Sequence, residues 1–434
     1  MEAIWVVSAD MGYGHQRAAW PFRAFARNGI LAAGDNDHAT PSERVLWRRY
    51  LRLYEAFSRA KGIPLVGKQL FGLLDRLLHI PSLYPIRNLS QSTYQVDLLY
   101  KQLKRGLGNG VLRAIEQEWL PLLTSFYVPA IAAAERGYDP VYCIICDADL
   151  NRVWVPREPW ESTITYFAPC GRAAHRLRSY GVPTERIHLT GFPLDDALLG
   201  GRDLVTLKRD LGTRLAVLDP RGRFRVAHQR SVEHFLGADA FPDVPAERVP
   251  HIVYAVGGAG AQTEIGLQLM TSLRHHLQAG TLRLTLVAGI RDDVRNIFVR
   301  HRERLALDTV TVLHCDTLDA YFEQFNTVIR TADILWTKPS ELSFYCGLGL
   351  PIVMTPTIGS QEKFNRKWLL ETGAGMRQEK LEGAADWIVD MLRDGRFADM
   401  AWLGFLRARK LGSFHIMDVL RHGTFKRSDD PLQR

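Results

Sequence analysis

The sequence predicts an α/β protein with two doubly wound domains that face each other across a cleft. Apolar, β-branched runs of strand length alternate with stretches of helical periodicity, and they do so in two separate series along the chain. Runs that are apolar throughout are typical of parallel strands covered by helices on both faces. The length of 434 residues, with 46% hydrophobic and 24% charged residues, fits a globular chain of about two domains.

The first series predicts a domain that ends at residue 194. Strands are expected at residues 3–10, 140–149, 162–170 and 186–193, and a helix at residues 171–181. Cys143 and Cys146 are a close cysteine pair, but they lie inside an apolar run. A buried strand is therefore preferred over a metal or redox motif, and no structural metal site is expected.

The second series predicts a domain at residues 195–410, followed by a C-terminal segment at 411–434. Residues 219–250 are interpreted as a basic, polar insertion before the strands begin. Because apolar strands alternate with helical patterns, the sheet is expected to be parallel. Its five predicted strands are residues 251–260, 282–290, 310–315, 333–338 and 351–356.

Positive charge is concentrated in one segment of the predicted first domain. Residues 44–105 contain twelve Lys or Arg and three acids, a net charge of +9. Because the whole chain carries +8, the rest of the chain has a net charge of about −1. The segment has amphipathic helical periodicity, broken by a proline-containing loop at 79–88. It is interpreted as a surface that seats on an anionic membrane, with a solvated face as the alternative. Nucleic acid is disfavoured because no binding motif accompanies the charge.

The N-terminus predicts no secretory signal, since the second residue is acidic and the apolar run is short. No apolar stretch approaches the roughly 18 residues that a membrane-spanning helix needs. We therefore expect a cytoplasmic protein, which the basic segment could hold peripherally at the inner face of the cell membrane.

A glycine-rich loop follows the first strand of the second series. Gly257, Gly258 and Gly260 lie between that strand and a helix, where small residues let backbone N–H groups approach a phosphate. A tight strand-to-helix turn without a ligand is the alternative. The spacing matches neither the dinucleotide fingerprint nor the P-loop.

The first domain has an equivalent loop. Gly12 and Gly14 follow the first strand, and His15 begins the helix. A titratable group in an open loop suits an acceptor or leaving-group role, and a histidine that only caps the helix is the alternative.

Two further strand ends carry clusters of polar side chains. Carboxylates, amides and hydroxyls at neighbouring strand ends provide the paired donors and acceptors that sugar and ribose hydroxyls need, with a solvated loop as the alternative. The residues are Thr337, Lys338, Ser340, Glu341, Thr357, Gly359, Gln361, Glu362 and Asn365.

These pieces, in this order, resemble the GT-B glycosyltransferases, and within them the monogalactosyl- and monoglucosyl-diacylglycerol synthases and the peptidoglycan N-acetylglucosaminyltransferase. The resemblance is distant and runs along most of the chain. It rests on the Gly12–His15 loop, the segment 147–154, the Gly-x-Pro at 191–193, the loop 255–266 and the segment 349–365.

The resemblance implies two facing Rossmann-like domains and a nucleotide-sugar donor, usually UDP-linked, held by the second domain without a metal or other cofactor. The acceptor, a lipid or membrane-associated molecule, would enter from the first domain, and the sugar carbon would be inverted. The implied diphosphate ligands are Gly257, Gly258, Gly260, Ala261 and Gln262.

The resemblance also assigns the other contacts. Gln361, Glu362 and Asn365 would meet the sugar, and His15 and Asp147 are candidates for the base. The ribose-binding Glu of the family aligns with Phe344, so Glu341 is the proposed substitute. Two alternatives stay open: a protein of this fold that binds a nucleotide or glycan without turnover, and a sugar-nucleotide epimerase.

Overall fold

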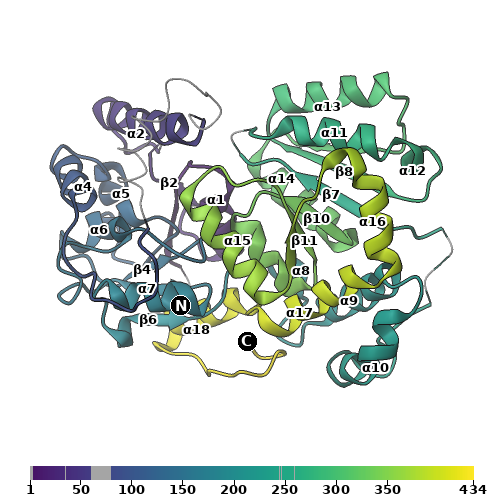
Figure 1. Cartoon of the computed structure of the whole chain (residues 1–434). Helices are drawn as coiled ribbons and strands as arrows, with labels where there is room; N and C mark the ends of the chain where they lie inside the picture. Colours follow the sequence, from purple (N-terminus) through teal and green to yellow (C-terminus); the bar gives the residue numbers. More distant parts are fainter. Residues whose placement is uncertain (1–2, 35, 60–79, 244, 246, 259) are drawn as a thin grey trace.

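The computed structural model describes residues 3–34, 36–59, 80–243, 245, 247–258 and 260–434. Two parallel six-stranded sheets, each flanked by helices, form two domains that lie side by side (Figure 1). This arrangement confirms the two doubly wound domains predicted from the sequence.

The first sheet has the strand order β2-β1-β3-β4-β5-β6, with every neighbouring pair parallel. The order reverses between β1 and β3, and in open α/β sheets such a switch point leaves a crevice at the carboxyl ends of the strands. Its strands are β1 (Trp5–Ser8), β2 (Leu31–Ala32), β3 (Leu122–Thr124), β4 (Val141–Ile144), β5 (Thr165–Ala168) and β6 (Ile187–Leu189).

Helices of the first domain connect these strands and cover the sheet. The 3-10 helices are η1 (Trp20–Phe25), η3 (Arg152–Trp154) and η4 (Thr184–Arg186). The α-helices are α1 (Tyr13–Ala19), α2 (Pro41–Arg59), α4 (Tyr94–Lys104), α5 (Asn109–Ile115), α6 (Tyr127–Ala134) and α7 (Gly171–Ser179).

The second sheet has the order β9-β8-β7-β10-β11-β12, again all parallel. Numbered within the domain, this is the order 3-2-1-4-5-6 of dinucleotide-binding folds, with the switch point between β7 and β10. Its strands are β7 (His251–Ala255), β8 (Arg283–Gly289), β9 (Thr311–His314), β10 (Ile334–Thr337), β11 (Ile352–Met354) and β12 (Gly375–Arg377).

Helices also surround the second sheet. The 3-10 helices are η5 (Glu341–Leu348) and η6 (Leu381–Gly383). The α-helices are α8 (Asp196–Leu199), α9 (Val205–Leu218), α10 (Arg223–Leu236), α11 (Thr263–Ser272), α12 (Arg274–Gln278), α13 (Asp292–Arg304), α14 (Leu318–Thr331), α15 (Ser360–Thr372), α16 (Ala384–Arg393) and α17 (Arg396–Arg407).

The chain crosses between the domains twice, and the two crossings run side by side. A Cβ atom placed on Gly191 of the first crossing would lie 2.7 Å from the Cβ of Arg409 in the second. The second crossing leads into α18 (Gly412–His422), which returns to the first domain: His415 Nδ1 lies 3.1 Å from the carbonyl oxygen of Thr190. Much of the segment 411–434 thus packs near the first domain (Figure 1).

Several elements differ from the sequence-based expectation, among them three strands and the helix α10. The strands β2, β3 and β12 were not predicted. No residue of β2 or β12 is buried, so neither is an apolar run, and β3 is followed closely by the apolar helix α6, so periodicity does not separate strand from helix there. Residues 223–236, interpreted as part of a polar insertion, form α10. This helix buries only Phe224 and Val232, so its apolar stripe is too weak to reveal a helix.

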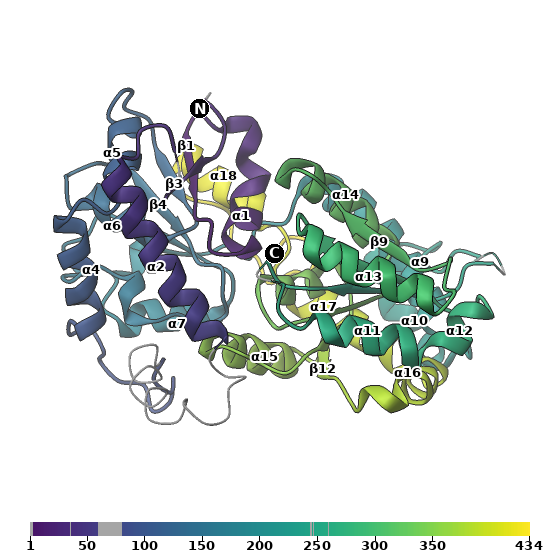
Figure 2. The ribbon, with the colours of Figure 1, turned by 90° about the horizontal axis from the view of Figure 1, so that it is seen from above.

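The basic segment 44–105 is described in part, since residues 60–79 lie outside the described residues. Arg48, Arg49 and Arg52 on α2 are exposed, as are Lys101 and Lys104 on α4. Figure 2 shows α2 and α4 next to each other on the outer side of the first domain. Within the described parts of the chain, no helix is both long and apolar enough to cross a bilayer.

Candidate interdomain site

The two topological switch points face each other across the domain boundary. The loop after β1 carries Gly12, and the loop after β7 carries Gly258. A Cβ atom on Gly258 would lie 3.1 Å from the Cα of Gly12 and 3.2 Å from the backbone N of Tyr13. A side chain at Gly258 would therefore push the domains apart. The glycine loops that the sequence predicted in separate domains are thus neighbours in space.

His15 lies in the first turn of α1 and faces the first domain. Its Nδ1 lies 2.7 Å from the carbonyl oxygen of Ser125, the residue after β3. Because a carbonyl can only accept, Nδ1 carries the proton and Nε2 is the acceptor nitrogen. Burial lowers the pKa of His15 below its ordinary value of 6.5, although the Ser125 bond opposes the shift. His15 is therefore a neutral imidazole near pH 7.

Aromatic rings fix the orientation of this imidazole. The His15 ring stacks on Trp154 with centroids 6.0 Å apart and meets Phe126 edge-on at 5.0 Å. The Sγ atom of Cys146 lies 3.6 Å from Nδ1. These contacts, together with the Ser125 bond, hold the ring in one place.

Asp147 follows β4 and is joined to the second domain. Asn365 of α15 donates from Nδ2 to Asp147 Oδ1 at 2.7 Å, and its Oδ1 accepts from the backbone N of Ala148, also at 2.7 Å. Burial raises the pKa of Asp147 to about 6, with the Asn365 bond opposing and the charge of Glu341 adding to the rise. Asn365 is fully buried. In this structure its amide therefore bridges the domains.

Lys338 lies against the glycine loop of the second domain. A Cβ atom on Gly257 would be 2.8 Å from Lys338 Cε, so the lysine side chain passes directly over this glycine. Lys338 Nζ is 3.5 Å from Oε1 of Glu362 on α15. Gly260, with φ 69°, then turns the chain toward the N-terminus of α11. A cation and a helix N-terminus at one glycine loop are the groups that bind phosphate.

Gln262 and Ala261 complete this loop. Gln262 has a φ of 69°, and both of its side-chain polar atoms are bound to the end of β11: Nε2 donates to Pro356 O at 2.7 Å, and Oε1 accepts from Thr355 Oγ1 at 2.7 Å. Its side chain thus fixes the loop rather than extending from it. Ala261 is half-buried between Gly260 and Gln262.

Glu341 reaches from the second domain to the first. Its Oε1 is 3.4 Å from Nε of Arg17, and a Cβ atom on Gly14 would lie 3.1 Å from its Oε2. The two hydroxyl residues before it shape the turn. The Thr337 hydroxyl donates to Ala255 O at 3.2 Å, and the backbone N of Ser340 donates to Lys338 O at 2.8 Å.

Phe344 lies in the core, although the family alignment placed it at a ribose-binding position. It stacks on Phe192 with centroids 5.3 Å apart, packs against Trp368 at 4.8 Å, and is 2% exposed. Glu341, at the start of the same 3-10 helix, is the carboxylate that faces the domain boundary.

Gln361 and Glu362 occupy the first turn of α15. Glu362 Oε2 accepts a 2.6 Å hydrogen bond from the backbone N of Ile358, so this side chain holds the loop that leads into its own helix in addition to contacting Lys338. Gln361 is half-buried, and its Oε1 would be 3.6 Å from a Cβ atom on Gly359.

Two residues that join the domains here, Tyr13 and Arg17, were not predicted from the sequence. The hydroxyl of Tyr13 accepts a 3.0 Å hydrogen bond from the backbone N of Ile290, and Arg17 inserts among aromatic rings of the second domain. The signal that could have indicated Arg17 is its position in the sequence. It lies two residues after His15, and a helix points side chains two residues apart in different directions. Tyr13 and Arg17 therefore belong to the same boundary as the predicted site residues.

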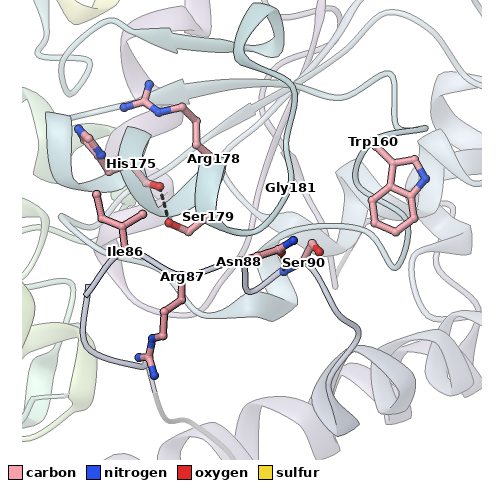
Figure 3. A pocket seen from close by; sticks show the side chains of 9 residues that line it. All are labelled: Ile86, Arg87, Asn88, Ser90, Trp160, His175, Arg178, Ser179 and Gly181. Carbon is pink, nitrogen blue, oxygen red and sulfur yellow. Dashed lines mark hydrogen bonds between the residues drawn. The ribbon is translucent and has the colours of Figure 1, made fainter. Parts of the chain in front are cut away.

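A cavity of about 470 Å³ lies in the first domain, between the segment 86–90 and the end of α7. In Figure 3, Arg87 and Arg178 point away from each other, and Trp160 stands at the opposite end from His175. The lining of this cavity includes none of the residues predicted to bind the donor or to act in catalysis. Within the described residues, no group of three or more His, Cys, Asp or Glu is placed to hold a metal.

Residues 296–402 match a family described as "Domain of unknown function (DUF6938)". No curated protein is significantly similar to the chain in sequence.

Among solved structures, the chain is similar to a UDP-GlcNAc 2-epimerase from Neisseria meningitidis bound to UDP-GlcNAc, at 13% identity and a TM-score of 0.46, over 96% of this chain and 97% of that one. It is similar to Acinetobacter baumannii MurG at 14% identity and 0.43, over 85% and 95%. The glycotransferase of kitacinnamycin gives 14% and 0.47, over 97% and 98%. These scores are below 0.5, and the fold described above follows from the chain's own two sheets.

Proposed function

We propose that the chain is a metal-independent, inverting glycosyltransferase that moves a sugar from a nucleotide diphosphate, with UDP as the first candidate, to a lipid or membrane-associated acceptor. One observation carries the proposal: the two switch points meet and bring complementary groups together. His15 and Asp147 come from the first domain, and Lys338 and Glu341 from the second. The meeting of the two loops therefore brings a proton acceptor from the first domain near a phosphate-binding cation from the second.

The donor would lie along the second domain. The diphosphate would bind the loop 257–262, where the N-terminus of α11 and Lys338 supply positive charge in place of a metal ion. Glu341 would accept hydrogen bonds from the ribose hydroxyls. Gln361 and Glu362, in the first turn of α15, would face the sugar.

The transfer would be a single displacement. The acceptor hydroxyl attacks the anomeric carbon, its proton passes to His15 Nε2, and the bond to the diphosphate breaks with inversion at that carbon. A neutral imidazole is suited to this proton transfer because its Nε2 is free of a proton and can accept one. The departing diphosphate gains negative charge next to Lys338, which stabilises it.

A membrane-associated acceptor is supported by the surface of the first domain. Exposed Arg48, Arg49 and Arg52 on α2 and Lys101 and Lys104 on α4 would attract an anionic membrane surface, each contributing about 1 kcal/mol. The protein would then act peripherally at the inner face of the cell membrane.

Binding without turnover is a second candidate, favoured by Asn365. The resemblance assigns this residue to the sugar, but its amide oxygen and nitrogen are bound to Ala148, Asp147 and Pro339. A donor could then occupy the loop 257–262 without the full set of sugar contacts that transfer needs.

The test is a turnover assay with radiolabelled UDP-glucose, UDP-galactose and UDP-N-acetylglucosamine, with and without vesicles that contain diacylglycerol and anionic phospholipid. Transfer of label to the lipid fraction, lost in His15→Ala, supports the proposal. Binding of a donor with no labelled product supports binding without turnover. Conversion of the sugar without transfer supports an epimerase instead.

A further inference from the structure

We propose that Arg17 is a positioning residue that reaches from the first domain into the second and orients Glu341 toward the Gly12–His15 loop. The carboxylate assigned to the ribose would then be in place only when the domains are closed. The inference rests on the proposed function, in which Glu341 contacts the donor.

Helix α1 lies at the boundary of the domains (Figure 2). His15 turns to Ser125 of the first domain, while Arg17 turns to the second. One short helix thereby positions both the imidazole proposed as the base and the guanidinium that holds the Glu341 carboxylate. Any movement of α1 relative to the second domain must change the two together.

The guanidinium of Arg17 is enclosed by the second domain. Its central carbon lies 4.2 Å from the ring centroid of Phe325 and 4.9 Å from that of Phe322. Nη2 donates to the hydroxyl of Tyr321 at 3.0 Å, and Nη1 approaches that of Tyr345 at 3.5 Å. The side chain is only 4% exposed. Aromatic faces and two hydroxyls therefore determine where the fork of N–H groups points.

Glu341 supplies the carboxylate for this buried cation. Arg17 Nε lies 3.4 Å from Oε1, while Oε2 lies next to Gly14. Without Arg17, the carboxylate would face an aromatic region with no cation to hold it, and a buried carboxylate without a partner moves or takes up a proton. Arg17 thus leaves Oε2, at the Gly14 side, as the oxygen directed to the first-domain loop.

The first experiment is a double-mutant cycle on UDP affinity, measured by isothermal titration calorimetry. Arg17→Lys keeps the charge but loses the fork, and Glu341→Gln keeps the shape but loses the charge. Each should weaken UDP about tenfold, the loss expected for one charge-assisted hydrogen bond. The double variant should bind no more weakly than the weaker single variant, because Arg17 acts through Glu341. If the losses of UDP affinity in the two single variants multiply in the double variant, the inference is overturned.

The control is Arg152→Lys. It makes the same chemical change at a buried arginine of the first domain, which donates to carbonyl oxygens of Val155, Pro156 and Ser90. This variant should bind UDP like the wild-type chain. An equal loss of affinity in Arg152→Lys would mean that Arg17→Lys acts only by weakening the fold, and would overturn the inference.

Hydrogen–deuterium exchange without ligand separates failure of this inference from failure of the proposed function. Arg17→Lys should speed exchange of the amides in 341–348, and Arg152→Lys should not. If the wild-type chain binds none of UDP, GDP and ADP, the function proposed above is contradicted, while exchange still decides the role of Arg17. Unchanged exchange in 341–348 would overturn the inference.

Discussion

Asn365 of α15 donates a 2.7 Å hydrogen bond to the Asp147 carboxylate across the domain boundary. The same side chain accepts from Ala148, so one amide of the second domain satisfies two groups at the end of β4. Asn365 is fully buried, and its removal takes this partner from both groups.

Asn365→Ala should therefore destabilise the chain by about 3 kcal/mol, since a partly buried carboxylate and a buried N–H group lose their partner. Urea unfolding at pH 7.5 measures this. Lys367→Ala, at an exposed position of the same helix, is the matched control and should change stability by less than about 0.5 kcal/mol. Equal losses in the two variants would contradict the bridging role.

Asp147→Asn should stabilise the chain above pH 6. Burial raises the pKa of this carboxyl to about 6, above the ordinary 3.8 that applies in the unfolded chain. The folded state therefore binds the proton more tightly, and wild-type stability falls as pH rises between about 4 and 6. The gain in Asp147→Asn should be on the order of 1 kcal/mol at pH 7.5 and should vanish near pH 4. A gain that is the same at both pH values would show that Asp147 does not titrate in this range.

His15→Ala should lower the rate of sugar transfer by about a hundredfold or more, the usual contribution of a general base. Donor affinity should stay near the wild-type value, because His15 faces the first domain. Burial lowers the pKa of His15, so kcat/KM in the wild-type chain should fall only below pH 6.5 as the imidazole gains a proton. A rate that is unaffected in His15→Ala would remove this residue from the mechanism.

Lys338→Ala should weaken UDP binding about tenfold and leave uridine binding unchanged, since the ammonium would contact only the diphosphate. Calorimetric titration with both compounds checks this. Lys367→Ala, which removes an exposed cation from α15, is the matched control. Loss of uridine affinity equal to that of UDP would place Lys338 away from the phosphates.

Replacing Arg48, Arg49 and Arg52 by Glu should abolish sedimentation with vesicles of anionic phospholipid at low salt, because each cation near the surface contributes about 1 kcal/mol. The matched control replaces three exposed arginines of α13, Arg295, Arg300 and Arg304, and so makes the same charge change in the second domain. Equal loss in both variants would point to net charge rather than to α2.

The sequence was sufficient for the architecture because the longer strands are apolar throughout. All five residues of β7 and all four of β10 are buried, and such runs are visible without a structure. The strand β3 was missed because the apolar helix α6 follows it closely, and periodicity does not separate a short apolar strand from such a helix. The missing strand matters for function, since the residue after it, Ser125, holds His15.

The site was predictable to the level of which loops meet, and less so for individual side chains. Glycines after strands indicated Gly12 and Gly258, which do lie together. The partners of Gln262 and Asn365 come from other strand ends and from the other domain, and local spacing carries no information about them. Arg17 was missed for the same reason, since its aromatic surroundings come from α14 and η5.

The most direct test of the proposed donor site is calorimetric titration of the wild-type chain with UDP, GDP and ADP, each with a Lys338→Ala control. We predict that at least one nucleoside diphosphate binds the wild-type chain and binds Lys338→Ala about tenfold more weakly. Absence of binding by all three, or binding that is indifferent to Lys338, would contradict it.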